Sequence, residues 1–163
     1  MDKRWRPSVT VAAIIERDGR FLIIEEETSG GLRLNNPAGH LDPGESMADG
    51  CAREALEETA WHFRPTALVG VYMARFVKQA DGEDITYLRF AFCGDLGAHE
   101  PHRRLDEGIV RVLWMTHEEL RASADRHRSP MVLRCVEDYL AGARIPLDRL
   151  HTDPSVYAAA RTS

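Results

Sequence analysis

The chain has few cysteines and no long apolar run. Its three cysteines, Cys51, Cys93 and Cys135, are widely spaced and form no C-x-x-C pair. Such a set is typical neither of a disulfide framework nor of a zinc site, so we expect reduced, packed thiols. No apolar segment approaches the roughly 20 residues of a membrane-spanning helix, and the first residues lack the apolar stretch of a signal peptide. We therefore expect a cytoplasmic protein that does not bind a membrane.

Positive charge is also scarce. The 21 lysines and arginines are outnumbered by 26 aspartates and glutamates, which gives a net charge of -5. This balance disfavours a nucleic-acid polymer as partner, because binding to a phosphate backbone depends on clustered cations. The length and composition are typical of a globular protein of one domain over residues 1–163, with a flexible tail at 151–163. A monomer is favoured over a dimer because no long apolar helix face is evident.

Several β-rich runs predict strands. Those at residues 9–15 and 21–24 lie on either side of Arg17-Asp18-Gly19, which is a hairpin signal. A second strand pair is predicted over residues 67–77 and 84–94, around Ala80-Asp81-Gly82, and a further strand over 110–114. Together with the helices described next, these strands imply a mixed β-sheet with helices on both sides, an α/β (α+β) fold.

Three helices are indicated by their ends. Ser46, followed three residues later by Asp49, approximates a capping box, so a helix is expected to begin just after Glu45. Thr116 and Glu119 form a similar pair ahead of a short helix that ends near Arg121. A final helix is predicted over residues 131–140, started by Ser129-Pro130 and followed by Gly142.

The first of these helices has an acidic front and a small, apolar back. At about 100° per residue, Glu54, Glu57 and Glu58 share one narrow arc, and small or apolar side chains lie nearly opposite. Crowded carboxylates repel one another, so the arrangement requires a neutralising cation, and hard oxygen ligands suit Mg²⁺ or Mn²⁺. The alternative is an ordinary solvated acidic face, as most charge runs are.

Neighbouring residues favour the metal site. Arg53 lies four residues before Glu57 and can pair with it, which would fix the direction of that carboxylate. Glu45 stands at the mouth of the helix, after an Asp-Pro-Gly turn at residues 42–44. Gly39 can bring backbone close to a metal or phosphate because it has no side chain.

Residues 39–61, GHLDPGESMADGCAREALEETAW, resemble the Nudix box, G-x5-E-x7-R-E-U-x-E-E-x-G-U, in which U is a bulky apolar residue. The fixed positions Gly39, Glu45, Arg53, Glu54, Glu57 and Glu58 all match. Two residues depart from the pattern, since Ala60 stands in place of glycine and Ala55 in place of a larger aliphatic residue. The resemblance implies a Nudix-type α/β/α sandwich with a loop-helix-loop catalytic motif.

The resemblance also implies the chemistry, which is metal-dependent hydrolysis of a phosphoanhydride. Divalent metals would be held by Glu54, Glu57 and Glu58, helped by Glu45 and by the Gly39 carbonyl, with Arg53 as a further catalytic-site residue. In the family the general base is sometimes a box glutamate, here Glu54, and sometimes an acid on a loop outside the box. The outside candidates here are Asp106 and Glu107, for which an ordinary solvated loop is the alternative interpretation.

Further segments along the chain, including VTVAAII, FLIIEEE, NNPAGHLDPGE and YLRFAF, are similar to a bacterial Nudix subgroup of small phosphatases. Members of that subgroup act on nucleoside di- and triphosphates and on the pyrimidine diphosphate of thiamine synthesis, which implies release of phosphate. Arg89, Asn36 and His40 are candidates for contact with phosphate or base, although Arg89 could instead point to water and His40 could bond to backbone.

Alternatives stay open at this stage. One is a pyrophosphatase for nucleoside-diphosphate-linked compounds of the ADP-ribose type. Another is a Nudix domain that senses a nucleotide without turnover, which the complete set of glutamates disfavours. A prenyl diphosphate isomerase is a remoter possibility. The sequence leaves the physiological substrate and leaving group, the number of metals and the identity of the general base undecided.

Overall fold

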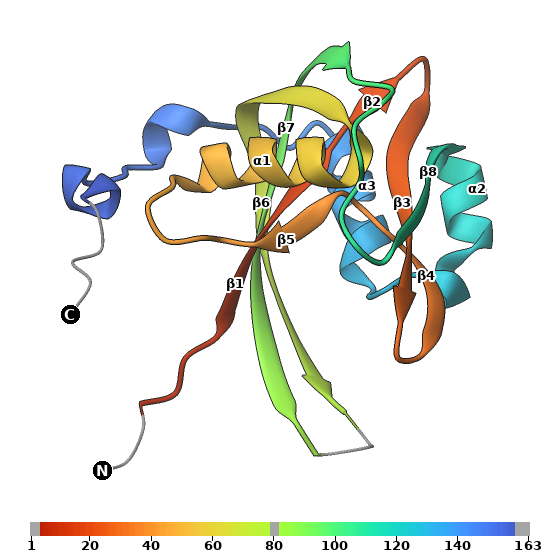
Figure 1. The fold of residues 1–163 in the computed structure, drawn as a ribbon, viewed down its shortest axis with the longest axis horizontal. Helices are drawn as coiled ribbons and strands as arrows, with labels where there is room; N and C mark the ends of the chain where they lie inside the picture. Colours follow the sequence, from red (N-terminus) through yellow and green to blue (C-terminus); the bar gives the residue numbers. More distant parts are fainter. Residues whose placement is uncertain (1–3, 79–81, 159–163) are drawn as a thin grey trace.

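A mixed five-stranded sheet forms the centre of the protein, seen in a computed structural model that describes residues 4–78 and 82–158. The strands lie in the order β5-β1-β7-β6-β9, and β1 runs parallel to β7 while the other neighbours are antiparallel. Their bounds are Ser8–Ile14 for β1, Ala38–His40 for β5, Trp61–Val77 for β6, Asp84–His99 for β7 and Ile145–Pro146 for β9. Figure 1 shows this sheet passing between helices.

A second, antiparallel sheet lies beside the first. In it β3 (Arg20–Thr28) pairs with β2 (Glu16–Arg17), β4 (Gly31–Asn35) and β8 (Ile109–Thr116). The predicted strand at 110–114 is thus confirmed as part of β8.

The predicted hairpin between residues 9–15 and 21–24 is wrong in its pairing. The turn at Asp18-Gly19 is present, with φ of 53° and 75°, but it joins β3 to the short β2. β1 pairs with β5 and β7 in the other sheet. The chain changes sheets at Ile15, where the Leu22 N–H donates to the Ile15 carbonyl. β1 is buried on both faces, so its apolar run belongs to a central strand and not to one arm of a hairpin.

Two helices cover opposite faces of the mixed sheet. Val11 and Ala13 of β1 pack in one apolar cluster with Cys51 and Ala55 of α1 (Met47–Thr59). Alternate residues of β1 pack in the other cluster, with Cys135 and Val136 of α3 (Met131–Leu140). Successive side chains of a strand point to opposite faces, so the two helices sandwich the sheet as expected. The α/β/α sandwich is confirmed, and the small Ala55 is fully buried against the sheet.

The predicted helix ends are confirmed. Ser46 caps α1 by accepting from the Asp49 N–H at 3.1 Å, and Ala60 ends it in the left-handed conformation with φ of 61°. Alanine in place of glycine at position 60 therefore strains the backbone but does not move the end of the helix. α2 (His117–Ala122) begins with a capping box between Thr116 and Glu119.

Short 3-10 segments complete the C-terminal third of the described chain, at Ala124–Arg126 (η1), Leu147–Arg149 (η2) and Pro154–Tyr157 (η3). Tyr157 lines a small recess together with Ser46 and Met47 at the start of α1. No helix within residues 4–78 and 82–158 is long and apolar enough to cross a membrane.

The predicted pair 67–77 and 84–94 is confirmed as part of the longer hairpin β6–β7. Its strands pair from Trp61 opposite His99 out to Val77 opposite Asp84, and the expected turn at Ala80-Asp81 lies outside the described residues. In Figure 1 the far half of this hairpin projects from the body of the molecule. We call residues 71–77 and 84–90 the arm. It forms one wall of the site described next.

Candidate active site

Arg53 is the centre of the hydrogen-bond network on α1. Its guanidinium donates to both oxygens of Glu45 at 2.9 and 2.8 Å, to Glu54 at 2.8 Å and to Glu57 at 2.9 Å. It also donates to the carbonyl of His40 at 3.0 Å. The predicted Arg53–Glu57 pair is therefore present, within a larger network than the sequence indicated. These carboxylates hold the pKa of Arg53 above its usual value.

Glu45 is tied to this network. In addition to Arg53, its carboxylate accepts from the Asp42 N–H at 2.7 Å. The hydrogen bond from Arg53 lowers the pKa of Glu45 despite partial burial. Glu45 therefore holds the guanidinium of Arg53, which in turn bonds to Glu54 and Glu57.

Gly39 lies in contact with Glu54. A Cβ at position 39 would lie 2.1 Å from the carboxyl carbon of Glu54 and 2.2 Å from each of its oxygens. Real atoms cannot approach so closely, so only glycine leaves this carboxylate in place. Burial raises the pKa of Glu54, and Arg53 opposes that effect.

Three carboxylates converge at the exposed side of α1. One oxygen each from Glu54, Glu57 and Asp106 lie within 4.8 Å of one another. Asp106 comes from the loop between β7 and β8, and its N–H donates at 3.0 Å to the Glu57 carbonyl near the end of α1. The loop thereby satisfies one of the free carbonyls of the last helical turn and brings its acid to the helix. Glu107 is exposed and is not a member of this carboxylate cluster.

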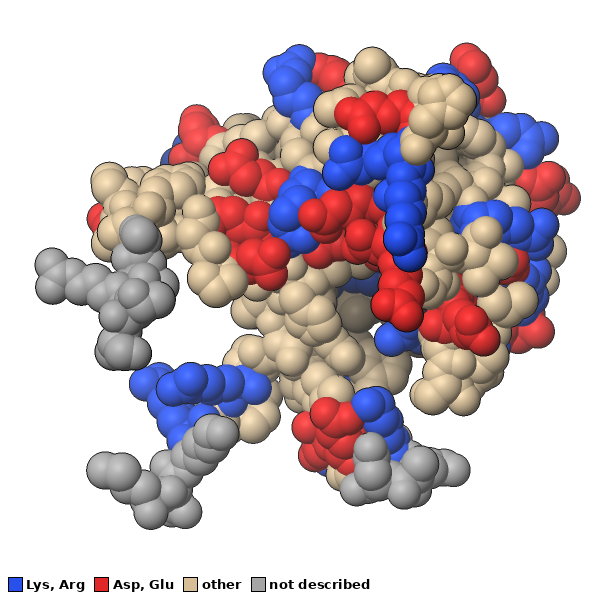
Figure 2. Space-filling model, viewed as in Figure 1, with Lys and Arg blue, Asp and Glu red and all other residues tan. Residues whose placement is uncertain are grey.

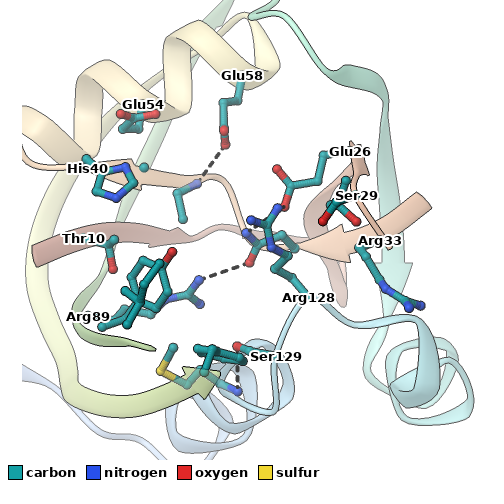
Figure 3. Close-up of a pocket in the computed structure, with 18 of the residues that line it drawn as sticks. Thr10, Glu26, Ser29, Arg33, His40, Glu54, Glu58, Arg89, Arg128 and Ser129 are labelled. Atoms are coloured by element: carbon teal, nitrogen blue, oxygen red, sulfur yellow. Dashed lines mark hydrogen bonds and ion pairs between the residues drawn. The ribbon is translucent and has the colours of Figure 1, made fainter. Parts of the chain in front are cut away.

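Glu58 does not belong to this group of three. It is buried, and it accepts from the Ala38 N–H at 2.8 Å. Burial raises its pKa to about 9, and the nearby acids Glu54 and Glu26 add to the effect. Its carboxyl therefore holds a proton more tightly than an ordinary glutamate does, and a nearby cation would counter this effect. Figure 3 shows Glu58 pointing into the same space as Glu54.

The chemistry of these groups fits Mg²⁺ or Mn²⁺. Carboxylate oxygens from Glu54 and Glu57 meet beside a backbone that approaches closely at Gly39, and hard cations prefer such oxygen ligands. Among the described residues, this is the acidic group whose ligand atoms lie close enough to share one ion. Figure 2 shows the acids around α1 as a red patch with blue arginine among them.

A cavity of about 540 Å³ opens next to the cluster. Glu54, Glu58, Gly39 and His40 line one end of it. The space-filling view shows the hollow below the acidic patch, between the body and the arm (Figure 2). This volume is that of a typical site for a small molecule.

Arg89 lies in this cavity, deep in the structure. It is 4% exposed, which excludes the alternative that it points to water. Its two terminal nitrogens donate to Asn36 at 3.0 Å and to Asn35 at 3.1 Å. Asn35 lines the cavity, whereas the predicted contact residue Asn36 is buried and is not part of the lining.

Sequence reasoning missed several residues of the cavity. From the arm come Phe76, Ile85 and Tyr87, and from the segment before α3 come Arg128 and Ser129. The spacing of Ile85, Tyr87 and Arg89 was the available signal, because alternate residues of a strand share one face. Arg128 had no such signal, since it lies far from the box in sequence and is placed by an ion pair with Glu26 at 2.8 Å and by a backbone hydrogen bond to Leu34.

Trp61 packs at the end of α1. Its ring stacks on His99 with centroids 4.5 Å apart and meets Trp114 edge-on at 6.2 Å. The guanidinium of Arg17 lies over both tryptophan rings. This aromatic packing lies at the C-terminal end of the box segment, away from the carboxylates.

Comparisons with known proteins identify the family of the chain. The NUDIX domain model matches residues 4–135. Phosphatase NudJ of Escherichia coli K12 is 32% identical over 146 residues, which is 90% of this chain and 92% of that protein. A NUDIX hydrolase from Nitrosomonas europaea is 48% identical, with a TM-score of 0.83 over 91% of this chain and 98% of its own. A MutT NUDIX hydrolase from Burkholderia pseudomallei, 19% identical with a TM-score of 0.66 over 82% of this chain and 98% of its own, shares the fold. The chain belongs to the Nudix family and is a phosphohydrolase that acts on phosphoanhydrides.

Proposed function

We propose that the protein is a divalent-metal-dependent phosphatase of nucleoside di- and triphosphates, or of a related small diphosphate such as the pyrimidine diphosphate of thiamine synthesis. The observation that carries the proposal is the convergence of Glu54, Glu57 and Asp106 at the edge of the cavity. The name of the Escherichia coli relative, a phosphatase, supports release of phosphate.

Glu54 and Glu57 would hold Mg²⁺ or Mn²⁺, with the Gly39 carbonyl and Glu58 as further ligands. When bound, the cation neutralises phosphate oxygens and lowers the pKa of a water molecule. Arg53 keeps Glu54 and Glu57 aimed at one point by donating to both. Glu58 would be held ionised by a cation bound there, because the positive charge would offset the cost of burial.

Asp106 is the proposed general base. Its carboxylate is exposed, so it can pass a proton to solvent, whereas Glu54 is buried and bound by Arg53. Asp106 would take the proton of the attacking water as the oxygen reaches phosphorus. The bond between that phosphorus and the bridging oxygen then breaks, and the organic phosphate leaves.

A variant in the cluster tests the proposal. Glu57→Gln should lower Mg²⁺-dependent phosphate release by at least about 100-fold, because the amide keeps the shape but loses the charge that holds the cation. Glu118→Gln, on the exposed surface of α2, is the matched control and should keep full activity. Circular dichroism and thermal unfolding show whether both variants fold. Normal turnover by folded Glu57→Gln would reject the mechanism.

A substrate panel tests the leaving group. Nucleoside di- and triphosphates, thiamine-pathway diphosphates and ADP-ribose are incubated with Mg²⁺ and scored for phosphate and for pyrophosphate. Phosphate from the first two groups is expected. Pyrophosphate and nucleoside monophosphate from triphosphates would reject a terminal phosphatase, and cleavage of ADP-ribose alone would favour the alternative pyrophosphatase. Nucleotide binding without turnover of any compound would favour a sensor.

A further inference from the structure

The loop between β7 and β8, residues 100–108, is held against the end of α1. The Glu100 N–H donates to the carbonyl of Ala60 at 2.8 Å, and the Asp106 N–H donates to the carbonyl of Glu57 at 3.0 Å. Both carbonyls belong to the end of the helix, where the helix itself offers no partner. In Figure 1 the loop runs from the end of β7 across this end of α1 to β8. The position of Asp106 therefore depends on how the loop is anchored.

The side chains of the loop give it little support of their own. Residues 101–104 are exposed, and so is Asp106. The downstream end of the loop is fixed, because the Gly108 carbonyl accepts from the Glu27 N–H of β3 at 2.8 Å. A segment with few buried contacts opens readily unless its ends are held. The upstream end, where the loop leaves His99, therefore needs an anchor as well.

A cluster of four side chains, which we call the aromatic clamp, lies at that upstream end. It consists of Arg17, Trp61, His99 and Trp114, from β2, β6, β7 and β8 in turn. Trp61 pairs directly with His99 in the β6–β7 register, and their rings stack with an angle of 26° between the planes. The Arg17 guanidinium lies 4.9 Å from the ring centre of Trp61 and 4.4 Å from that of Trp114. Such contacts hold the rings in a defined relative position.

The clamp bridges the two sheets at the loop. Trp61 and His99 belong to the mixed sheet, whereas Arg17 and Trp114 belong to the second sheet. The loop leaves the first sheet at His99 and enters the second at Ile109. The clamp therefore fixes the strands at the two ends of the loop relative to each other. None of its four members is among the described residues that line the cavity.

We propose that His99 is a positioning residue for catalysis. Its stack on Trp61 holds the upstream end of the loop, and the loop in turn keeps the carboxylate of Asp106 beside Glu54 and Glu57. This inference rests on the proposed function, in which Asp106 is the general base. A base displaced by about 1 Å loses on the order of 100-fold in rate, so a small movement of the loop is enough to affect the reaction.

A purely structural role for the stack leads to a different result. Loss of a ring pair that only stabilises the β6–β7 hairpin lowers the melting temperature and leaves the folded enzyme fully active. Loss of a ring pair that positions Asp106 lowers kcat in the folded enzyme. KM and the Mg²⁺ affinity then stay the same, because the cavity lining and the carboxylates of Glu54 and Glu57 are unchanged.

Two substitutions at His99 test the inference by kinetics. His99→Ala removes the stack and should lower kcat by about tenfold or more, with KM and the apparent Mg²⁺ affinity unchanged. His99→Phe keeps a ring on Trp61 and should stay within about twofold of the wild type. His151→Ala removes an exposed histidine outside the clamp and should keep full activity as the control. Thermal unfolding shows whether the three variants are folded at the assay temperature.

Hydrogen exchange reports the position of the loop without turnover. The Asp106 amide is bonded to the Glu57 carbonyl. In His99→Ala this amide should exchange at least about fivefold faster than in the wild type, and in His99→Phe it should not. Unchanged exchange in His99→Ala would overturn the proposal, because the loop would then keep its place without the stack.

A double variant shows whether the effect on the rate passes through Asp106. In the Asp106→Asn background, His99→Ala should lower kcat further by less than about twofold. The proposal is overturned if the two losses multiply, or if folded His99→Ala keeps full kcat while Asp106→Asn is impaired. A normal rate for Asp106→Asn alone would instead reject the proposed base, and exchange of the Asp106 amide would still decide whether His99 positions this residue.

Discussion

The backbone of Gly39 and the carboxylate of Glu54 occupy adjoining space, with no room for a Cβ between them. This contact joins β5 to α1 and fixes one of the carboxylates in the cluster. Gly39 has no positive φ, so its requirement for glycine arises from this neighbour and not from its own conformation. The first prediction follows from that distinction.

Gly39→Ala should lower kcat/KM by about 100-fold while the protein stays folded. The added methyl group displaces only the end of the flexible Glu54 side chain, so the fold can adjust. A displacement of about 1 Å at a reacting group nevertheless lowers the rate by about 100-fold. Steady-state kinetics and thermal unfolding measure the two effects. Gly30→Ala is the control, since its Cβ would make ordinary contacts at 3.7 Å or more. Full activity of Gly39→Ala would show that Glu54 need not occupy this position.

Arg53→Lys should weaken Mg²⁺ binding by about 10- to 100-fold and reduce kcat. A lysine keeps the charge but cannot donate at once to Glu45, Glu54 and Glu57, as the planar guanidinium does. Mg²⁺ titration of activity gives the apparent affinity. Arg134→Lys provides the comparison, because Arg134 pairs with Asp138 four residues on, at the surface of α3. Equal effects of the two variants would mean that Arg53 contributes only an ordinary surface ion pair.

Asp106→Asn should have a kcat about 100-fold or more below that of Glu107→Gln, although the two residues are neighbours in the sequence. Asp106 reaches the carboxylate cluster and Glu107 does not. If Asp106 removes the proton, its variant should bind Mg²⁺ nearly as well as the wild type and lose the acidic limb of the pH–rate profile. A large loss of Mg²⁺ affinity would instead make Asp106 a metal ligand, and a normal rate would leave Glu54 as the base.

The Nudix box could be recognised from the sequence because its residues lie close together along the chain. Ser46, Arg53 and Glu57 lie within one helix and its cap, so spacing alone determines which of them meet. The same reasoning placed Glu58 in a shared arc with Glu54 and Glu57, but it could not show that the backbone N–H of Ala38 in β5 donates to Glu58. Contacts of that kind depend on how β5 packs against α1.

Features that depend on contacts between distant segments could not be predicted from the sequence, for the same physical reason. The apolar runs around Asp18-Gly19 identified strands correctly, yet a hairpin and a change of sheet share the same local pattern until the partners of β1 are known. Arg89 stood out as a charge in an apolar strand, but its burial depends on Asn35 and Asn36 from a distant segment. The substrate cavity is assembled from such segments, and so its shape required the structure.

Glu25 should make the stability of the protein sensitive to acid. Its carboxylate is 3% exposed and pairs with Arg111, at 2.8 Å, and with Arg126. The hydrogen bond from Arg111, with further help from Arg126, holds the pKa of Glu25 below its ordinary value of 4.5. The folded protein therefore binds this proton less readily than the unfolded chain. The resulting stabilisation is fully present above pH 4.5 and disappears as the pH falls through the lower, folded-state pKa.

Glu25→Gln should reduce the free energy of unfolding by about 1–3 kcal/mol at pH 7, and by progressively less below pH 4.5. Urea unfolding from pH 3 to 8 measures this difference, with Glu27→Gln on the exposed side of β3 as the control. A difference that stays constant over this range would show that the loss comes from packing and not from the charge of Glu25.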